Sequence, residues 1–138
     1  MVARCSHETR RRRFLGGTAA IPQSYLTRIC APRPGDVHFV AVAGERILAL
    51  ASLCDADLGL LVEDEWQAAG IGRLLLRRLL ERALNPVTAE VGEGNGPMLA
   101  WLRRLEPVAV VPQQYGWRVV LEPAASLRRL GRTLEAAA

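Results

Sequence analysis

The stretch of this chain that could carry chemistry is a run of small residues containing two glycines. It reads Gln67-Ala68-Ala69-Gly70-Ile71-Gly72. The glycines and alanines remove the side chains that would keep a bulky anion away from the backbone. Backbone N–H groups at the start of a helix, with the positive end of the helix dipole, form a ready anion site. The run therefore predicts an anion site made of main chain, suited to a diphosphate.

A strand and a helix must hold this loop in place. The expected strand is short and apolar, with Leu58, Leu60, Leu61 and Val62. The expected helix has apolar residues at helical spacing, namely Ile71, Leu74, Leu75, Leu79 and Ala83. A helix that begins directly after a glycine turn presents free N–H groups to the loop. Arg73, in its first turn, could add positive charge at the rim of the site.

Other phosphate-binding loops do not fit this spacing. A dinucleotide-binding fingerprint needs G-x-G-x-x-G, whereas the order here is Q-x-x-G-x-G. A Walker loop needs a lysine, and the chain contains none. A glycine pair that merely begins an ordinary helix is the remaining alternative.

The segment that runs from Gln67 to Gly72, after a strand that ends in Val62, resembles the acetyl-CoA pyrophosphate loop of the GNAT N-acetyltransferases. A serine, an arginine-rich turn and Arg13-Phe14 are similar to the first helix of the bacterial protein-lysine acetyltransferase type. The resemblance implies an α/β (α+β) fold with a mixed, mostly antiparallel central sheet and helices on both faces. The family's opening strand is missing or atypical, since only five residues precede the first expected helix at Ser6.

The resemblance also implies the activity and the cofactor. Acetyl-CoA would donate its acetyl group to a primary amine by direct attack in a ternary complex. Two neighbouring strands of the sheet would splay apart, and the backbone of Leu60, Leu61 and Val62 would pair with the pantetheine arm. An N–H near Leu61 or Val62 would face the thioester oxygen, and the amides of residues 67–73 would hold the pyrophosphate. Asn95 and Met98 match a later family signature, in which the asparagine lies beside the pantetheine arm.

The proton acceptor is open between three carboxylates. Related sequences often carry a glutamate on this strand, and Asp57 stands at the matching place, one methylene shorter. Glu63 is the second candidate, although it belongs to an acidic triplet that reads equally well as a solvated turn. Glu90, on the adjacent expected strand, is the third.

Two substitutions keep a non-catalytic alternative open. Many family members protonate the leaving thiolate with a helix tyrosine, whose place is taken here by Leu102. Glu106-Pro107 stands where the family usually has Gly-Phe. Together with the missing strand, these departures allow a degenerate acyl-CoA-binding or regulatory module on the same fold.

Composition sets the remaining expectations. The 138 residues suit one domain at 1–122 with a C-terminal tail at 123–138 that reads as a helix. The net charge of +4, carried by arginine alone, suits a polyanionic ligand such as coenzyme A. Three scattered cysteines and two histidines predict free thiols, no metal site and a cytoplasmic location. The acceptor is a small-molecule amine or a protein lysine, with no membrane partner and with a homodimer plausible.

The arginine run at 10–13 permits two other interpretations. Followed by Phe14 and small apolar residues up to Ile21, it mimics a twin-arginine export signal, but the apolar stretch is short and no A-x-A cleavage site follows. As a nucleic-acid patch, it lacks interleaved aromatic residues. We therefore expect the run to belong to the first helix.

Overall fold

One mixed sheet of six strands organises the chain, which we describe from a computed structural model covering residues 1–15 and 21–136, with side chains up to residue 132. The strand order is β1-β2-β3-β4-β6-β5. Every neighbouring pair is antiparallel except β3 and β4. The strands are β1 Val37–Ala43, β2 Arg46–Cys54, β3 Asp57–Val62, β4 Val87–Gly92, β5 Ala109–Gln113 and β6 Gly116–Leu121.

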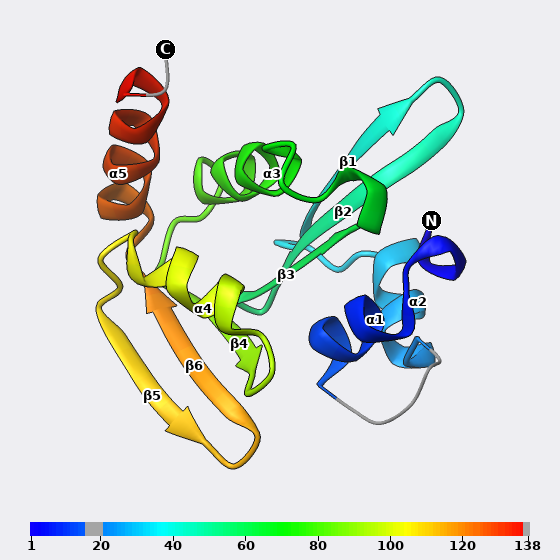
Figure 1. The fold of residues 1–138 in the computed structure, drawn as a ribbon, viewed down its shortest axis with the longest axis horizontal. Coiled ribbons are helices and arrows are strands. Elements are labelled where there is room, and N and C mark those ends of the chain that lie inside the picture. Colours follow the sequence, from blue (N-terminus) through cyan, green and yellow to red (C-terminus); the bar gives the residue numbers. More distant parts are fainter. Residues whose placement is uncertain (16–20, 137–138) are drawn as a thin grey trace.

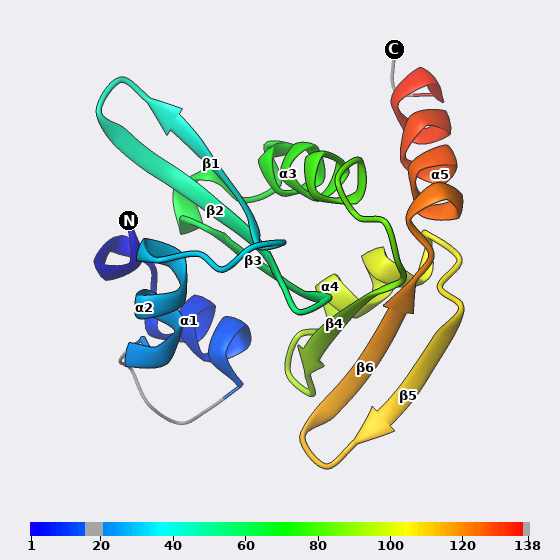
Figure 2. The same cartoon turned by 180° about the vertical axis from the view of Figure 1, so that it is seen from behind.

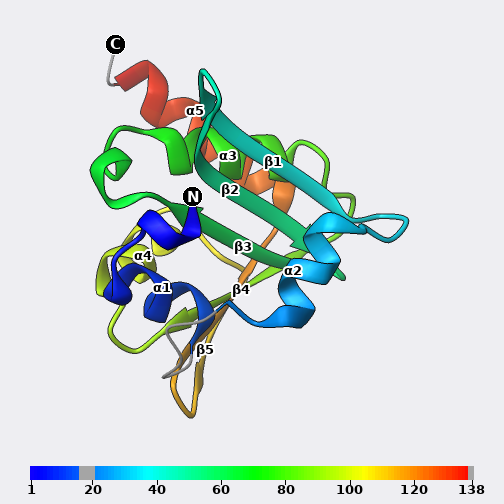
Figure 3. The ribbon, with the colours of Figure 1, turned by 90° about the vertical axis from the view of Figure 1, so that its right-hand side faces the viewer.

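Helices cover both faces of the sheet, which confirms the predicted fold class (Figures 1 and 2). The α-helices are α1 His7–Phe14, α2 Gln23–Cys30, α3 Ile71–Leu80, α4 Gly96–Arg103 and α5 Pro123–Ala136, and two short 3-10 helices span Val2–Arg4 and Asp64–Trp66. Turned by 90°, the fold shows α3 and α5 on one side of the strands and α1 with α2 on the other (Figure 3). The opening segment Val2–Arg4 is a 3-10 helix, in agreement with the missing first strand.

The main core lies on the face that α3 covers. Strand alternation places Ala49, Ala51 and Leu53 of β2 on this face. The matching stripe of α3 comprises Leu75, Leu76, Leu79 and Leu80, each at most 4% exposed. The small β2 residues leave room for the helix leucines, so α3 packs closely against the sheet.

The expected tail helix also packs on this core. Leu130 of α5 is 1% exposed and belongs to the same apolar cluster. Arg73 Nη2 donates a hydrogen bond to the Leu130 carbonyl at 2.8 Å, which joins α3 to α5. No helix in the described ranges is long and apolar enough to cross a membrane. Residues 16–20, which belong to the segment that mimics an export signal, lie outside the described residues.

The two halves of the sheet separate between β3 and β4. Their parallel pairing is limited to Asp57 with Thr88 and Leu58 with Ala89. The other four residues of β3 pair with β2 and not with β4. An opening of this kind at the centre of the sheet is what the family resemblance implied.

Candidate active site

A cavity of about 410 Å³ lies at the opening between β3 and β4. Consecutive residues of β3, from Leu58 to Val62, line it. Because successive strand residues point to opposite faces, the cavity passes through the sheet from the α3 face to the α1 face. The other lining residues are Thr9, Arg12, Arg13, Trp66, Gln67, Ala68, Gly70, Gly72, Arg73, Leu76, Ala89, Glu90, Val91, Asn95, Pro97, Met98, Trp101 and Leu102.

The glycine loop forms one end of this cavity. Gly70 is left-handed with φ +83° and precedes α3 without a side-chain cap among the described residues. The first helical hydrogen bond runs from the Leu74 N–H to the Gly70 carbonyl at 3.0 Å. The N–H groups of residues 71–73 therefore have no acceptor inside the helix and face the loop.

Gly72 has little room for a side chain. A Cβ there would lie 3.2 Å from Leu60 Cδ2 and 3.6 Å from Val62 Cγ2. The bare backbone thus forms a cradle where β3 and α3 meet, of the kind that a diphosphate needs for close approach. The residues of the loop fit the phosphate end of coenzyme A in chemistry and in available space.

The hydrogen-bond pattern of β3 decides which of its amides face the opening. The Glu63 N–H donates to the Leu48 carbonyl of β2 at 2.9 Å. Bonded and non-bonded pairs alternate along antiparallel strands, so Leu61 also bonds to β2, opposite Leu50. The backbone groups of Leu60 and Val62 point the other way, into the opening. The Leu61 N–H is therefore directed at β2, and the N–H groups that face the opening are those of Leu60 and Val62.

Polar side chains of the expected cofactor site stabilise its walls. Gln67 Nε2 donates to the Val62 carbonyl at 3.2 Å and to Thr9 Oγ1 at 3.1 Å. Asn95 caps α4 by accepting a hydrogen bond from the Met98 N–H at 3.4 Å. Of the expected cofactor residues, only Ala69 and Ile71 do not line the cavity.

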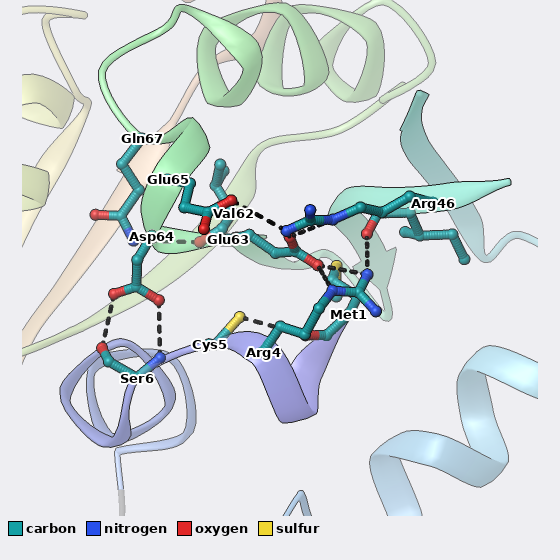
Figure 4. Close-up of polar contacts among 11 residues, drawn as sticks. Met1, Arg4, Cys5, Ser6, Arg46, Val62, Glu63, Asp64, Glu65 and Gln67 are labelled. Atoms are coloured by element: carbon teal, nitrogen blue, oxygen red, sulfur yellow. Dashed lines mark hydrogen bonds and ion pairs between the residues drawn. The ribbon is translucent and has the colours of Figure 1, made fainter. Parts of the chain in front are cut away.

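The structure brings neither Asp57 nor Glu63 to the cavity. Asp57 is exposed at the first position of β3, where β3 still pairs with β4. Glu63 is 1% exposed and accepts hydrogen bonds from Arg4 Nε at 2.7 Å and from Arg46 Nη2 at 2.6 Å (Figure 4). Burial by itself would raise the pKa of Glu63, but the two guanidinium groups outweigh it and hold this pKa below its ordinary value. Glu63 is thus an ionised carboxylate that joins the N-terminus to the sheet.

Glu90 is the one carboxylate among the described residues that line the cavity. It follows Ala89 on β4, so its side chain points to the face opposite the core, toward α1. Arg118 Nε, directly across on β6, donates to Glu90 Oε1 at 2.6 Å. The Glu90 side chain is 35% exposed. Glu90 is therefore a fixed and accessible carboxylate at the opening.

Sequence reasoning missed the residues that α1 contributes. Thr9, Arg12 and Arg13 line the cavity from above the α1 face of the sheet. Their spacing of i, i+3 and i+4 places them on one side of α1. However, Arg10 and Arg11 put charge on the other sides of the same helix, so the sequence alone does not single them out. Leu102, at the place of the family's tyrosine, also lines the wall and is 1% exposed.

A second group of polar residues has the spacing of metal ligands, although the sequence predicts no metal site. Asp36, His38 and Cys54 have their ligand atoms within 4.8 Å of one another. However, Arg28 Nη2 donates to Asp36 Oδ1 at 2.6 Å, and this pairing lowers the pKa of Asp36. Arg28 already neutralises this carboxylate, so a metal ion would have to displace it.

Comparison with known proteins defines the fold. No family model and no curated protein matches the sequence. Among solved structures, the GNAT domain of PAT from S. lividans has a TM-score of 0.72 at 17% identity, covering 87% of this chain and 80% of that one. A ribosomal-protein-alanine N-acetyltransferase from Brucella melitensis has a TM-score of 0.64 at 18% identity, covering 86% and 88%. YncA of Salmonella typhimurium, a putative acetyltransferase solved with its cofactor acetyl-CoA, has 0.62 at 17%, covering 87% of each chain. The chain therefore has the GNAT acetyltransferase fold.

Proposed function

We propose that this protein is an acetyl-CoA-dependent N-acetyltransferase that acts on a primary amine. The observation that carries the proposal is one cavity that runs through the sheet, from the uncapped start of α3 to Glu90. Acetyl-CoA in the structure of YncA, which shares the fold, supports the same ligand here. The cavity thus joins an anion site, a strand edge and a proton acceptor in the order that acetyl transfer needs.

Three sets of backbone groups would contact the cofactor. The N–H groups at residues 70–73 would hold the pyrophosphate, and the backbone of Val62 would pair with the pantetheine arm in place of the Gln67 side chain. The arm would then run back along β3 from the loop, which puts the thioester beside Leu60. We assign the Leu60 N–H as the donor to the thioester oxygen.

Acetyl-CoA supplies an activated acetyl group to this site. Glu90 takes the amine proton, directly or through one water, as the N–C bond forms and the C–S bond breaks. Arg118 fixes the orientation of the Glu90 carboxylate by its bond to Oε1. Leu102 offers no proton, so solvent returns one to the departing thiolate. The sheet and α1 hold amine and thioester together, which lowers the barrier by proximity.

The test measures release of the coenzyme thiol with acetyl-CoA and a panel of amines, beside thermal stabilisation by acetyl-CoA alone. We expect stabilisation and turnover above the uncatalysed rate with at least one class of amine. Stabilisation without turnover across the panel would instead indicate the degenerate acyl-CoA-binding module. No stabilisation at millimolar acetyl-CoA would exclude both functions.

A further inference from the structure

The guanidinium group of Arg13 lies directly on the β3 backbone at the opening of the sheet. A Cβ added to Gly59 would lie 1.9 Å from Arg13 Nη2 and 2.6 Å from Arg13 Cζ. Any side chain at position 59 would therefore displace the arginine. The glycine in the middle of β3 makes space for a cation on the α1 face of the cavity.

Aromatic rings and the cavity surround this cation. The Arg13 Cζ atom is 5.1 Å from the ring centroid of Phe14 and 4.8 Å from that of Tyr25. Arg13 Nε is buried and has no hydrogen-bond partner, and no described carboxylate forms an ion pair with this side chain. The Phe14 and Tyr25 rings meet edge to face at 69°, so the two aromatic contacts hold the guanidinium group from two directions. A guanidinium group so held keeps N–H donors for a planar anion. A partly buried arginine that lines a cavity, with a buried Nε that has no partner, indicates an anionic ligand group, because buried polar groups are normally paired.

Glu90 lies on the opposite side of the opening from Arg13. Gly59 and Glu90 are on adjacent strands that diverge, and both positions lie on the α1 face of the sheet. Leu60, next to Gly59, donates the proposed bond to the thioester oxygen, and one residue of strand spans only about 3.3 Å. The cation and the proton acceptor therefore both flank the position where the amine must attack.

We propose that the acceptor is a small amino acid, whose carboxylate binds Arg13 while its amine faces Glu90. This inference rests on the proposed acetyl transfer and names its substrate class. The short span between Gly59 and Leu60 requires that amine and carboxylate belong to one compact molecule. Arg12 lines the same wall but is paired with Glu8 at 2.9 Å, so the charge that would repel a polyamine there is that of Arg13.

The test compares acceptors that differ only by the carboxylate. Phenylalanine is paired with phenethylamine and lysine with cadaverine, and kcat/KM is measured by thiol release. In the wild-type protein we expect the amino acid of each pair to be favoured by about 10- to 100-fold, as for a hydrogen-bonded charge pair. In Arg13→Met this preference should disappear, mainly through a higher KM for the amino acid, and Arg13→Lys should restore part of it.

Arg82→Met is the matched control, because Arg82 is exposed after α3 and does not line the cavity. It should keep the preference of the wild type. Stabilisation by acetyl-CoA checks that Arg13→Met is folded, and if it is not, Arg13→Lys alone must change the ratio. The proposal is overturned if the wild type favours the decarboxylated amines or a peptide lysine, or if the Arg13 variants keep the ratio. In those cases acetyl transfer still stands, whereas no turnover with any amine removes both.

Discussion

The two ends of the cavity are built in different ways. The end proposed for coenzyme A consists mainly of backbone, with Gly70 and Gly72 keeping side chains away from the start of α3. The end proposed for the acceptor consists of side chains, with Arg13 from α1 and Glu90 from β4. A backbone site suits a ligand part that all members of a fold share, whereas side chains can change to suit a particular acceptor. The following experiments separate the two ends, beginning with the largest expected effect.

Replacing Glu90 with glutamine should remove the proton acceptor and leave the coenzyme end intact. We expect kcat/KM to fall about 100- to 10,000-fold, the usual contribution of general base catalysis. Thermal stabilisation by acetyl-CoA should stay at the wild-type value. Asp57→Asn makes the same change of charge at the start of β3 and should leave kcat/KM unchanged. A loss in Asp57→Asn that Glu90→Gln does not show would place the proton acceptor at the start of β3.

Replacing Gly72 with glutamate should instead damage the coenzyme end of the cavity and leave the proton acceptor in place. The side chain would contact Leu60 and Val62, and its charge would repel phosphate, so affinity for acetyl-CoA should fall about 100-fold or more. Titration calorimetry measures this loss directly. Gly44→Glu adds the same charge at the β1–β2 turn, where nothing lies within 4 Å. Its left-handed φ of +58° makes a side chain cost stability, but acetyl-CoA should bind normally. Wild-type affinity in Gly72→Glu would mean that the loop only begins a helix.

Glu63 sharpens the comparison, because it is an expected catalytic residue whose contacts are structural. Its pKa is lowered in the folded protein, so its ion pairs stabilise the fold above the unfolded carboxyl pKa of about 4.3. This contribution is lost as the pH falls through the still lower folded pKa. Glu63→Gln should therefore lower the Tm at pH 7, and the difference from wild type should shrink below about pH 4.3.

The control for this experiment is Glu65→Gln, whose side chain is 76% exposed and contacts Arg46 at 3.2 Å. Its effect on the Tm should be small at every pH. A difference for Glu63→Gln that stays constant or grows in acid would contradict the structural role of these ion pairs.

The smallest expected effect comes from backbone strain at Ala68, in the loop at the coenzyme end of the cavity. Ala68 has a left-handed φ of +60°, which disfavours a residue with a Cβ. Ala68→Gly should relieve this strain and raise stability by about 0.5 kcal/mol after the entropy cost of glycine. Ala69→Gly, at a position without positive φ, should lower the Tm instead. Destabilisation of both variants to the same extent would exclude the strain.

The sequence predicts the strand and helix of the backbone end but not the contacts of the side-chain end, for a physical reason. Strand, glycine turn and helix are consecutive, so their pattern is readable within about 25 residues of sequence. The partners of Glu63 lie 59 and 17 residues away, and only the fold brings them together. Arg13 belongs to a run of four arginines that puts charge on every side of a helix, so spacing alone does not select it. The choice of Leu60 over Leu61 depends on strand pairing that the sequence does not contain.

The two residue pairs that join β3 to β4 leave an incomplete ladder in the free protein. A peptide-like ligand inserted there would act as an extra strand and bridge the two halves of the sheet. The backbone amides of Leu60 and Val62 would then become slow to exchange their hydrogens for deuterium on binding. The Leu61 amide is already bonded to β2, so its exchange rate would change less. The exchange rates of these three successive amides therefore report whether a ligand is bound between β3 and β4.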